Sequence, residues 1–452
     1  MLSDADEEFL TQLHRNCELR DIGPGDERYV PLERYPEAVG PDSVRYLSRS
    51  IARTSRGSVF FLSGLRGSGK TTQLARLQIE LRGKGFAAVR IDAEQYLNLR
   101  QPVDIVEFLF FLVGGIADAV DEAGWAPEQK ASTRAWERLR QWLQGLPRRL
   151  SVRTEAELGG GFDLPGLIEA KVNLKAEIAR DESFVAELRR FLDGRLSELA
   201  AEANSVVEQL VRELRDAWPA RGQGEWLGLV VLVDSLDHVR GSDFLAIRRA
   251  LVDLFDKQAR VLTLHACTSV FIVPPYLHPG YGTMRKLTNI KVADRDRVPF
   301  PRGIEALREV VTRRFPDGAI DRMFTDEGLL EGLLLTSGGN LRDLLRLVTE
   351  VATQAESLPV DATTVTGAIA QIRNNLLPLS DDERAALARV AEEHRAPLHS
   401  QDKWSELSNL FDRHLVLGYS NGETWYDVHP LIADEVNAKG APPDEPFTTG
   451  RG

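Results

Sequence analysis

The residues that could do chemistry begin with a glycine-rich loop. Residues 64–71 read Gly-Leu-Arg-Gly-Ser-Gly-Lys-Thr, which fits the pattern G-x-x-x-x-G-K-[ST]. Glycines let such a loop curl with its backbone N–H groups turned inward, where they can hold nucleotide phosphates. Lys70 would neutralise β- and γ-phosphate charge, and the Thr71 hydroxyl would bind magnesium. A turn that fits the pattern by chance is the alternative. The predicted contacts to ATP or GTP are Gly64, Gly67, Ser68, Gly69, Lys70, Thr71 and Thr72.

Two acidic residues follow an apolar run and could act on the metal ion and on water. The run Leu229–Val233 leads into Asp234-Ser235-Leu236-Asp237. A carboxylate at the end of a buried strand rarely stays unpaired without a cation, so Asp234 is predicted to hold a magnesium-bound water. Asp237 would orient the attacking water, or it would cap a helix N-terminus. Lys70, Asp234 and Asp237 together predict nucleotide hydrolysis.

Short apolar runs separated by helical stretches would position these residues. This alternation predicts an α/β fold with a parallel sheet. Both the loop and Asp234 would follow buried strands of this sheet. The five predicted strands are residues 59–62, 87–91, 229–233, 261–266 and 287–292.

Composition indicates an ordinary globular protein of several domains. The chain has 452 residues, 43% of them hydrophobic, and a formal net charge of -12, which disfavours a surface that coats nucleic acid or anionic lipid. Cys17 and Cys267 offer neither a disulfide framework nor a zinc site. The N-terminus is acidic where a signal peptide is basic, and the apolar run 108–117 is too short to span a membrane. We therefore expect a cytoplasmic protein without a membrane anchor.

A long interval between the second and third strands predicts a helical insertion at about 125–226. Apolar residues at helical spacing run from Leu188 to Leu214, which predicts one helix from Glu182 to Trp218. With a second helical run, residues 131–143, it could form a protruding hairpin, with a hinge at Gly159-Gly160-Gly161. A helix packed on its own domain is the alternative to an arm that binds a partner.

The remaining segments complete a predicted domain plan. Residues 1–57 are expected to form a polar linker, 58–300 the nucleotide-binding domain, and 301–376 a helical lid. Helices followed by two strand-like runs around Asn421-Gly422 predict a winged helix over 377–440. Residues 441–452 are expected to be a disordered tail.

The order of phosphate loop, Asp-Ser-Leu-Asp, helical lid and winged helix resembles the STAND class of P-loop NTPases within the AAA+ superfamily. The NACHT and NB-ARC families belong to this class. The resemblance spans about residues 20–435, and only the phosphate loop is specific by itself. Asp234 and Asp237 match the paired acids of these families. Ser235 stands where AAA+ motors carry glutamate, which disfavours a fast, continuous motor.

The resemblance implies roles for five further residues. Thr268 and Ser269 would sense the γ-phosphate, or simply cap a strand end. Arg342, in Ser-Gly-Gly-Asn-Leu-Arg, would reach the phosphates as a sensor-2 arginine, and Arg285 would act as an arginine finger toward a neighbouring subunit. Both could instead be surface arginines. His429 would contact ADP phosphates from the winged helix, although Pro430 replaces the aspartate of the family motif, and a structural histidine is the alternative.

These expectations favour an ATP-binding, slowly hydrolysing switch that oligomerises or acts on a separate effector protein, with bacterial antiphage defence as one setting. A DNA-binding AAA+ regulator or loader is the alternative. Its predicted recognition helix, residues 401–413, carries two basic residues against three acidic ones, which is poor for binding phosphates. A small-molecule kinase ranks last because the lid and winged helix leave no evident substrate pocket.

Overall fold

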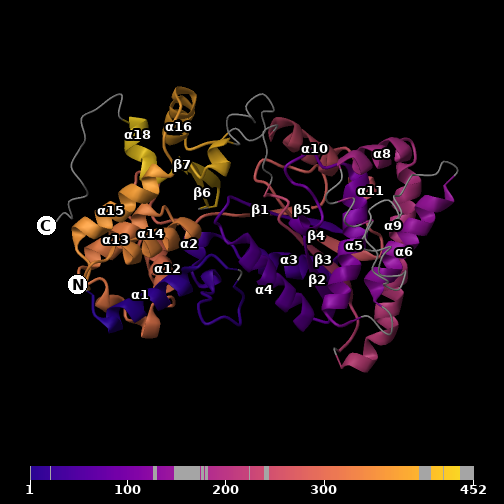
Figure 1. The fold of residues 1–452 in the computed structure, drawn as a ribbon, viewed down its shortest axis with the longest axis horizontal. Coiled ribbons are helices and arrows are strands. Elements are labelled where there is room, and N and C mark those ends of the chain that lie inside the picture. The colour runs from indigo at the N-terminus through magenta and orange to yellow at the C-terminus, as the bar shows by residue number, and fades with distance from the viewer. Residues whose placement is uncertain are drawn as a thin grey trace, which may run out of the picture. The chain divides into compact units, whose positions relative to one another are not determined.

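The computed structural model describes residues 2–20, 22–125, 130–146, 174, 178, 182–222, 224–238, 244–396, 409–420 and 422–437. Its elements run from α1 (Asp4–Cys17) to α18 (Ala433–Asn437) (Figure 1). The chain divides into two compact units that alternate along the sequence. Unit 1 comprises residues 1–43, 64–75 and 286–452, and unit 2 comprises residues 44–63 and 76–285. The phosphate loop therefore belongs to unit 1, and the acidic strand end at Asp234 belongs to unit 2.

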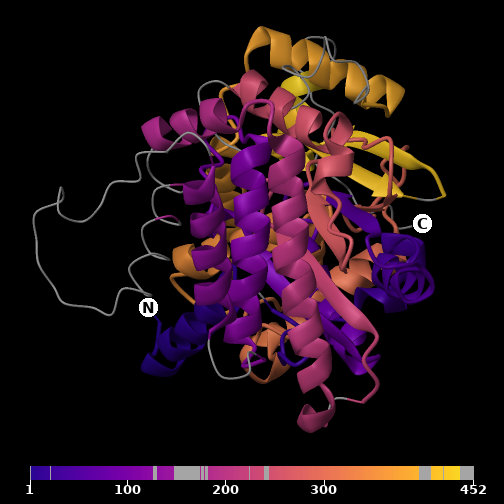
Figure 2. The same cartoon turned by 90° about the vertical axis from the view of Figure 1, so that its right-hand side faces the viewer.

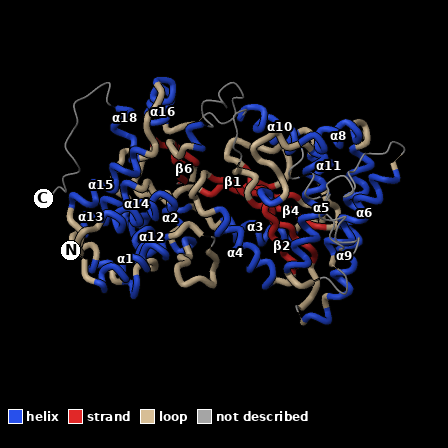
Figure 3. The backbone as a smooth tube through the Cα atoms, in the orientation of Figure 1, coloured by secondary structure: helices blue, strands red, loops and turns tan. Residues whose placement is uncertain are grey.

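A five-stranded sheet has the order β2-β3-β4-β1-β5 (red in Figure 3). Neighbouring strands from β2 to β1 pair in parallel. Every residue of β1, β3 and β4 is buried, as in parallel sheets whose faces are both covered. The α/β fold and the first three predicted strands are confirmed. The strands are β1 (Val59–Gly64), β2 (Phe86–Asp92), β3 (Gly228–Asp234), β4 (Cys267–Val273) and β5 (Thr283–Leu287).

The predicted fourth strand was wrong. Residues 259–262 form the short helix α11 (Ala259–Leu262), and β4 begins only at Cys267. The run Cys267–Val273 ends in Val-Phe-Ile-Val, whose branched and aromatic side chains fit a buried pleated surface better than the preceding residues do.

The predicted fifth strand was also misplaced, because β5 ends at Leu287, where the expected run begins. The backbone N–H groups beyond it bond to other parts of unit 1. Those of Asn289, Ile290 and Lys291 donate to the carbonyl oxygens of Gly418, Gly339 and Ala38 at 2.8, 3.1 and 2.9 Å. Residues 289–291 therefore tie three segments of unit 1 together.

Helices of the insertion and the helix that precedes it build much of the core of unit 2. The apolar run 108–117 lies inside α5 (Ile105–Glu122), which packs against β2, α6 (Ala131–Gly145) and α9 (Leu196–Ala217) (Figure 2). Gly114 permits a close approach of α6, since a Cβ there would lie 2.0 Å from the Trp136 ring. No helix among the described residues is long and apolar enough to cross a bilayer.

The single long helix expected from Glu182 to Trp218 was wrong. It is broken into α8 (Glu182–Leu192) and α9, and Gly194 between them has φ +77°. The leucine face of α9 packs into the unit 2 core instead of forming a protruding arm, and Leu199 and Leu214 are buried. The expected hinge at Gly159–Gly161 lies outside the described residues. Unit 2 also contains α10 (Phe244–Asp256) and most of α3 (Ser43–Arg53).

Unit 1 is mainly helical. Its N-terminal segment, expected to be a linker, begins with α1, which packs against α14. A capping box formed by Ser3 and Asp6 starts this helix. The other helices of the segment and the predicted lid are α2 (Pro36–Val39), α12 (Pro301–Thr312), α13 (Glu327–Thr336), α14 (Leu341–Gln354) and α15 (Ala362–Asn374).

The C-terminal part of unit 1 follows the order expected of a winged helix. Helix α16 (Asp381–Glu393) precedes an antiparallel hairpin of β6 (Val416–Ser420) and β7 (Thr424–Val428). Gly422 in the turn has φ +102°, which glycine adopts without strain. The predicted recognition helix, residues 401–413, lies mostly outside the described residues, and the expected tail lies wholly outside them.

Candidate phosphate-binding site and acidic strand end

The phosphate loop connects β1 to α4 (Lys70–Gly83), and its glycines fit the backbone that they occupy. Gly67 and Gly69 have φ +82° and +83°, in the left-handed region that other residues rarely adopt. A Cβ on Gly64 would lie 2.8 Å from the Leu287 carbonyl oxygen. The segment is thus a tight curl in which glycine is needed at these positions, as expected of a backbone cradle for phosphates.

Lys70 opens α4 with its ammonium group turned into the loop. The side chain is buried, and Nζ donates to the carbonyl oxygens of Gly64 and Leu65 at 2.9 and 2.8 Å. Thr71 and Thr72 follow in the first helical turn, where the helix dipole favours an anion. Ser68 N–H donates to the Leu65 carbonyl at 3.2 Å. The charge and the helix N-terminus predicted to face phosphate therefore lie in one segment of unit 1.

The first turn of α14 contacts this loop. Asn340 caps the helix, and its Nδ2 donates to the Arg66 carbonyl oxygen at 3.0 Å. Arg342 lies two residues further, its N–H donating to Asn340 Oδ1 at 3.0 Å. The predicted sensor-2 arginine is therefore in the same unit as the loop. Asn340 was missed as a site residue, although an asparagine directly before an apolar helical run signals an N-cap.

The same helical turn also contacts the winged-helix segment through a buried carboxylate. Asp343 Oδ2 lies 3.3 Å from His414 Nδ1 and 3.4 Å from His429 Nε2, and all three residues are buried. Burial alone would raise the pKa of Asp343, but the two imidazoles outweigh it and hold this pKa below its ordinary value. Burial also lowers the pKa of His414, against the opposing pull of Asp343. Asp343 is therefore an anion that faces two imidazole rings.

His429 is not placed to contact a nucleotide in this structure. Its side chain is fully buried, and its Nδ1 accepts from the Leu431 N–H at 3.2 Å. An accepting Nδ1 leaves the ring proton on Nε2, which faces Asp343 at 3.4 Å without good hydrogen-bond alignment. The expected phosphate contact is thus replaced by the structural alternative, because both ring nitrogens already face protein groups.

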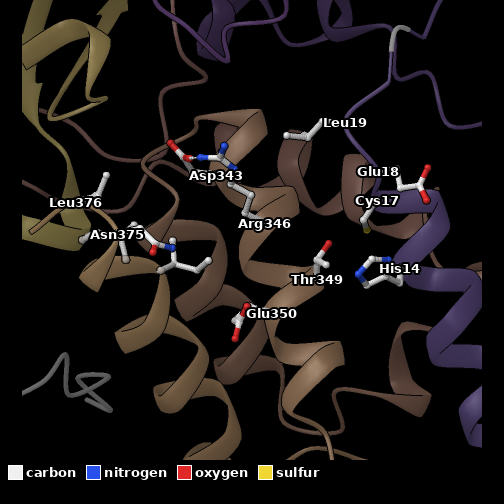
Figure 4. A pocket seen from close by; sticks show the side chains of 12 residues that line it. His14, Cys17, Glu18, Leu19, Asp343, Arg346, Thr349, Glu350, Asn375 and Leu376 are labelled. Atoms are coloured by element: carbon white, nitrogen blue, oxygen red, sulfur yellow. Dashed lines mark hydrogen bonds and ion pairs between the residues drawn. The ribbon is translucent and has the colours of Figure 1, made fainter. Parts of the chain in front are cut away.

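A pocket of about 460 Å³ opens in unit 1 beside this cluster. Figure 4 shows Asp343 and Arg346 on α14 and Cys17 on α1 among its lining residues. Arg346 Nη1 lies 3.4 Å from Asp343 Oδ1. Cys17 is buried, which raises its pKa to about 11. Asp343 therefore has a cationic neighbour, Arg346, in addition to the two imidazoles.

In unit 2, the acidic strand end holds a buried carboxylate with a second acid nearby. Asp234 closes β3 and is 5% exposed, with Oδ1 accepting from the Ser235 N–H at 2.8 Å. Burial, together with the nearby charge of Asp237, raises the pKa of Asp234 to about 6. Ser235 has φ +69°, so the chain turns sharply after the strand. A cation would relieve this crowding of negative charge.

Thr268 and Ser269 were expected at the end of the fourth predicted strand and Arg285 before the fifth, but the structure places all three elsewhere. Thr268 and Ser269 lie at the start of β4, where Ser269 pairs with Val59 and Val231. In a parallel sheet this is the edge opposite to the carboxyl end of β3, so the expected γ-phosphate sensor was misplaced. The carboxyl end of β4 is Val273. Arg285 lies within β5 instead of before it, and its guanidinium stacks on the Tyr46 ring at 4.4 Å.

Comparisons with known proteins do not assign this chain to a family. No family model matches the sequence, and no curated protein matches it. Among solved structures, the chain is similar to the Aeropyrum pernix ORC2 protein in ADPNP-ADP complexes. The match covers 94% of this chain and 98% of that chain, with 12% sequence identity and a TM-score of 0.40. A likeness of this degree does not bear on what the chain binds or does.

Proposed function

We propose that this chain is an ATP-binding and slowly hydrolysing molecular switch of the STAND/AAA+ type, with magnesium as the metal ion. The observation that carries the proposal is the first turn of α14. Asn340 in this turn bonds to the phosphate loop, and Asp343 faces two histidines of the winged-helix segment. A change in the loop on nucleotide binding can therefore bias the contacts of the winged helix.

Further contacts support this coupling within unit 1. The Tyr419 hydroxyl of β6 donates to the Gly338 carbonyl at 2.7 Å, just before α14. A Cβ on Gly339 would lie 1.7 Å from the Ile290 carbonyl, and the Ile290 N–H donates to the Gly339 carbonyl at 3.1 Å, so the segment before the helix packs closely on residues 289–291. Nucleotides would then favour one arrangement of lid and winged helix by their differential affinity for the two forms.

Four predicted site residues have chemistry that suits hydrolysis. Lys70 would neutralise phosphate charge, Thr71 and Asp234 would bind magnesium or its water, and Asp237 would orient the attacking water. The metal ion would supply charge neutralisation at the phosphates. Ser235 in place of a glutamate suits slow turnover, in which hydrolysis acts as a timer. Arg342 and Arg285 stay candidates for contacts that complete the site.

The output of the switch would be self-association or action on an effector protein, with antiphage defence as one setting. Light scattering with Mg-ADP and with a non-hydrolysable ATP analogue tests this, with and without the products of neighbouring genes. We expect the mass of the protein or its complex to differ between the two nucleotides, and Lys70→Ala to remove the difference. An unchanged monomer under all these conditions would contradict the proposal.

DNA binding through the winged helix is the less favoured alternative. Arg413, one of the two basic residues of the predicted recognition helix, is engaged inside unit 1. Its Nη1 bonds to Glu383 at 2.5 Å and its Nη2 to the Leu376 carbonyl at 2.6 Å. Salt-sensitive duplex binding that is lost on deleting residues 379–440 would reverse this ranking.

A further inference from the structure

Asn340 holds α14 and the phosphate loop through a single amide group. Its Oδ1 accepts from the N–H groups of Arg342 and Asp343 at 3.0 and 3.3 Å. Its Nδ2 donates to the Arg66 carbonyl oxygen at 3.0 Å, and the side chain is fully buried. Because two N–H donors fix the oxygen, the NH₂ group must face the loop.

The carbonyl that Asn340 holds belongs to the peptide between Arg66 and Gly67. In a planar trans peptide, the C=O and N–H bonds point in opposite directions. A donor on the Arg66 oxygen therefore also fixes the direction of the Gly67 N–H, one of the loop amides that can bind phosphate. The approach is close, since a Cβ on Gly67 would lie 2.2 Å from Asn340 Oδ1. Glycine at 67 and asparagine at 340 thus fit each other.

We propose that Asn340 is a positioning residue for phosphate binding: it orients the Arg66–Gly67 peptide so that the Gly67 N–H is presented to the nucleotide phosphates. The inference rests on the proposed function and assigns this residue a role in it. Serine or aspartate would also cap α14. Serine is too short to span from the cap to the loop carbonyl, and an ionised aspartate has no donor, so asparagine alone among the good caps meets both demands.

The variants Asn340→Asp and Asn340→Ser separate the cap from the tether. Asn340→Asp keeps the cap but turns a carboxylate oxygen toward the Arg66 carbonyl, which favours a flipped peptide whose N–H faces the carboxylate. Isothermal titration with Mg-ADP should show affinity weakened about 10- to 100-fold, because one hydrogen bond to a charged group is lost. Asn340→Ser should weaken binding less, since it removes the tether without repulsion. Asn340→Asp should also lower the melting temperature without nucleotide, because it buries a carboxylate, so the titrations are made at a temperature where every variant is folded.

A pH series gives a readout that a purely structural role would not move. Once protonated, the carboxyl group introduced by Asn340→Asp regains an O–H donor for the Arg66 carbonyl, and burial raises the pH at which this happens. The variant-to-wild-type ratio of dissociation constants should therefore shrink as the pH is lowered from about 8 to about 5.5. The wild type shares all the surrounding charged groups, so the ratio isolates the new carboxyl. These groups include Arg66, Arg342, Asp343, Arg346, His414 and His429.

Asp361→Asn is the matched control, because it exchanges the same two groups at the exposed cap of α15, where Asp361 accepts from the Thr364 N–H at 2.8 Å. It should leave nucleotide affinity unchanged. A wild type that binds no nucleotide overturns the proposed function and this inference with it. If the wild type binds nucleotide and both Asn340 variants bind it with the affinity of wild type, the inference alone is overturned. An equal loss in Asp361→Asn would also overturn it, by showing a general response of the lid.

Discussion

Lys70 and Asp234 show how a buried charge can be held ready for a ligand. The Lys70 ammonium donates to two loop carbonyls, which are neutral acceptors that a phosphate oxygen can replace. Asp234 has one backbone donor and a second acid nearby, so its ionised form is poorly compensated. Residues in such environments are candidates for functional sites because their burial costs stability.

Replacing Asp234 by asparagine should therefore stabilise the protein in the absence of magnesium. The folded pKa of about 6 lies above the ordinary value of 3.8, so ionisation near pH 7 costs stability that is regained as pH falls from about 6 toward 3.8. Asp234→Asn should raise the unfolding free energy at neutral pH by up to about 3 kcal/mol, with the gain vanishing near pH 4. Urea denaturation at several pH values measures this. A variant less stable than wild type at neutral pH would contradict the argument.

Lys70→Ala should abolish nucleotide binding and leave the fold intact. It removes the loop's only lysine and two hydrogen bonds at one turn, but none of the apolar core. Titration with Mg-ATP should show no saturable binding, while circular dichroism stays that of wild type. The exposed Lys257, which pairs with Asp253 at 2.7 Å, provides the control Lys257→Ala with normal affinity. Normal ATP affinity in Lys70→Ala would refute the loop assignment.

Helices and strands that a continuous run of residues specifies could be predicted from the sequence. Features that depend on contacts between distant residues could not. Strands β1 and β3 contain unbroken apolar runs, and β2 is apolar except for Arg90 and Asp92, as expected for strands of a covered parallel sheet. Residues 289–291 look equally like a strand, yet three distant carbonyls take their N–H groups. Asn340 could be predicted as a cap, but its bond to Arg66 joins residues 274 positions apart. The Asp343–His414 pair, 71 positions apart, was hidden for the same reason.

The break between α8 and α9 and a continuous helix predict opposite effects of Gly194→Ala on stability. Gly194 has φ +77°, which costs other residues about 1 kcal/mol, so Gly194→Ala should destabilise unit 2 by about that amount. If the helix were continuous, the same change would stabilise it by up to about 1 kcal/mol. Gly332 lies inside α13, and no atom outside the nearby backbone of that helix lies within 4 Å of its ideal Cβ, so Gly332→Ala should stabilise. Thermal unfolding of the two variants decides between the two arrangements.

For the whole molecule, the two units hold buried acids in opposite electrostatic environments. Asp234 in unit 2 has a raised pKa because burial and a like charge dominate, whereas two imidazoles keep Asp343 in unit 1 ionised. The negative charge of Asp234 therefore destabilises the folded state of unit 2, whereas that of Asp343 joins the lid to the winged helix in unit 1. Acid should therefore act on these two sites with opposite signs.

His414→Asn tests the unit 1 side of this contrast. Burial lowers the folded pKa of His414 below its ordinary 6.5, although Asp343 opposes the shift. As pH falls below about 6.5, the unfolded chain binds a proton that the folded chain resists, so stability is lost on acidification. His414 has φ +61°, a conformation that asparagine tolerates, and asparagine does not titrate. On lowering the pH from about 7.5 to about 5.5, the unfolding free energy of wild type minus that of His414→Asn should therefore fall. Over the same pH change, the unfolding free energy of wild type minus that of Asp234→Asn should rise. Urea denaturation of the three proteins at both pH values measures these two differences. If both differences changed in the same direction, the environments described here for Asp234 and for the Asp343–His414 pair could not both be right.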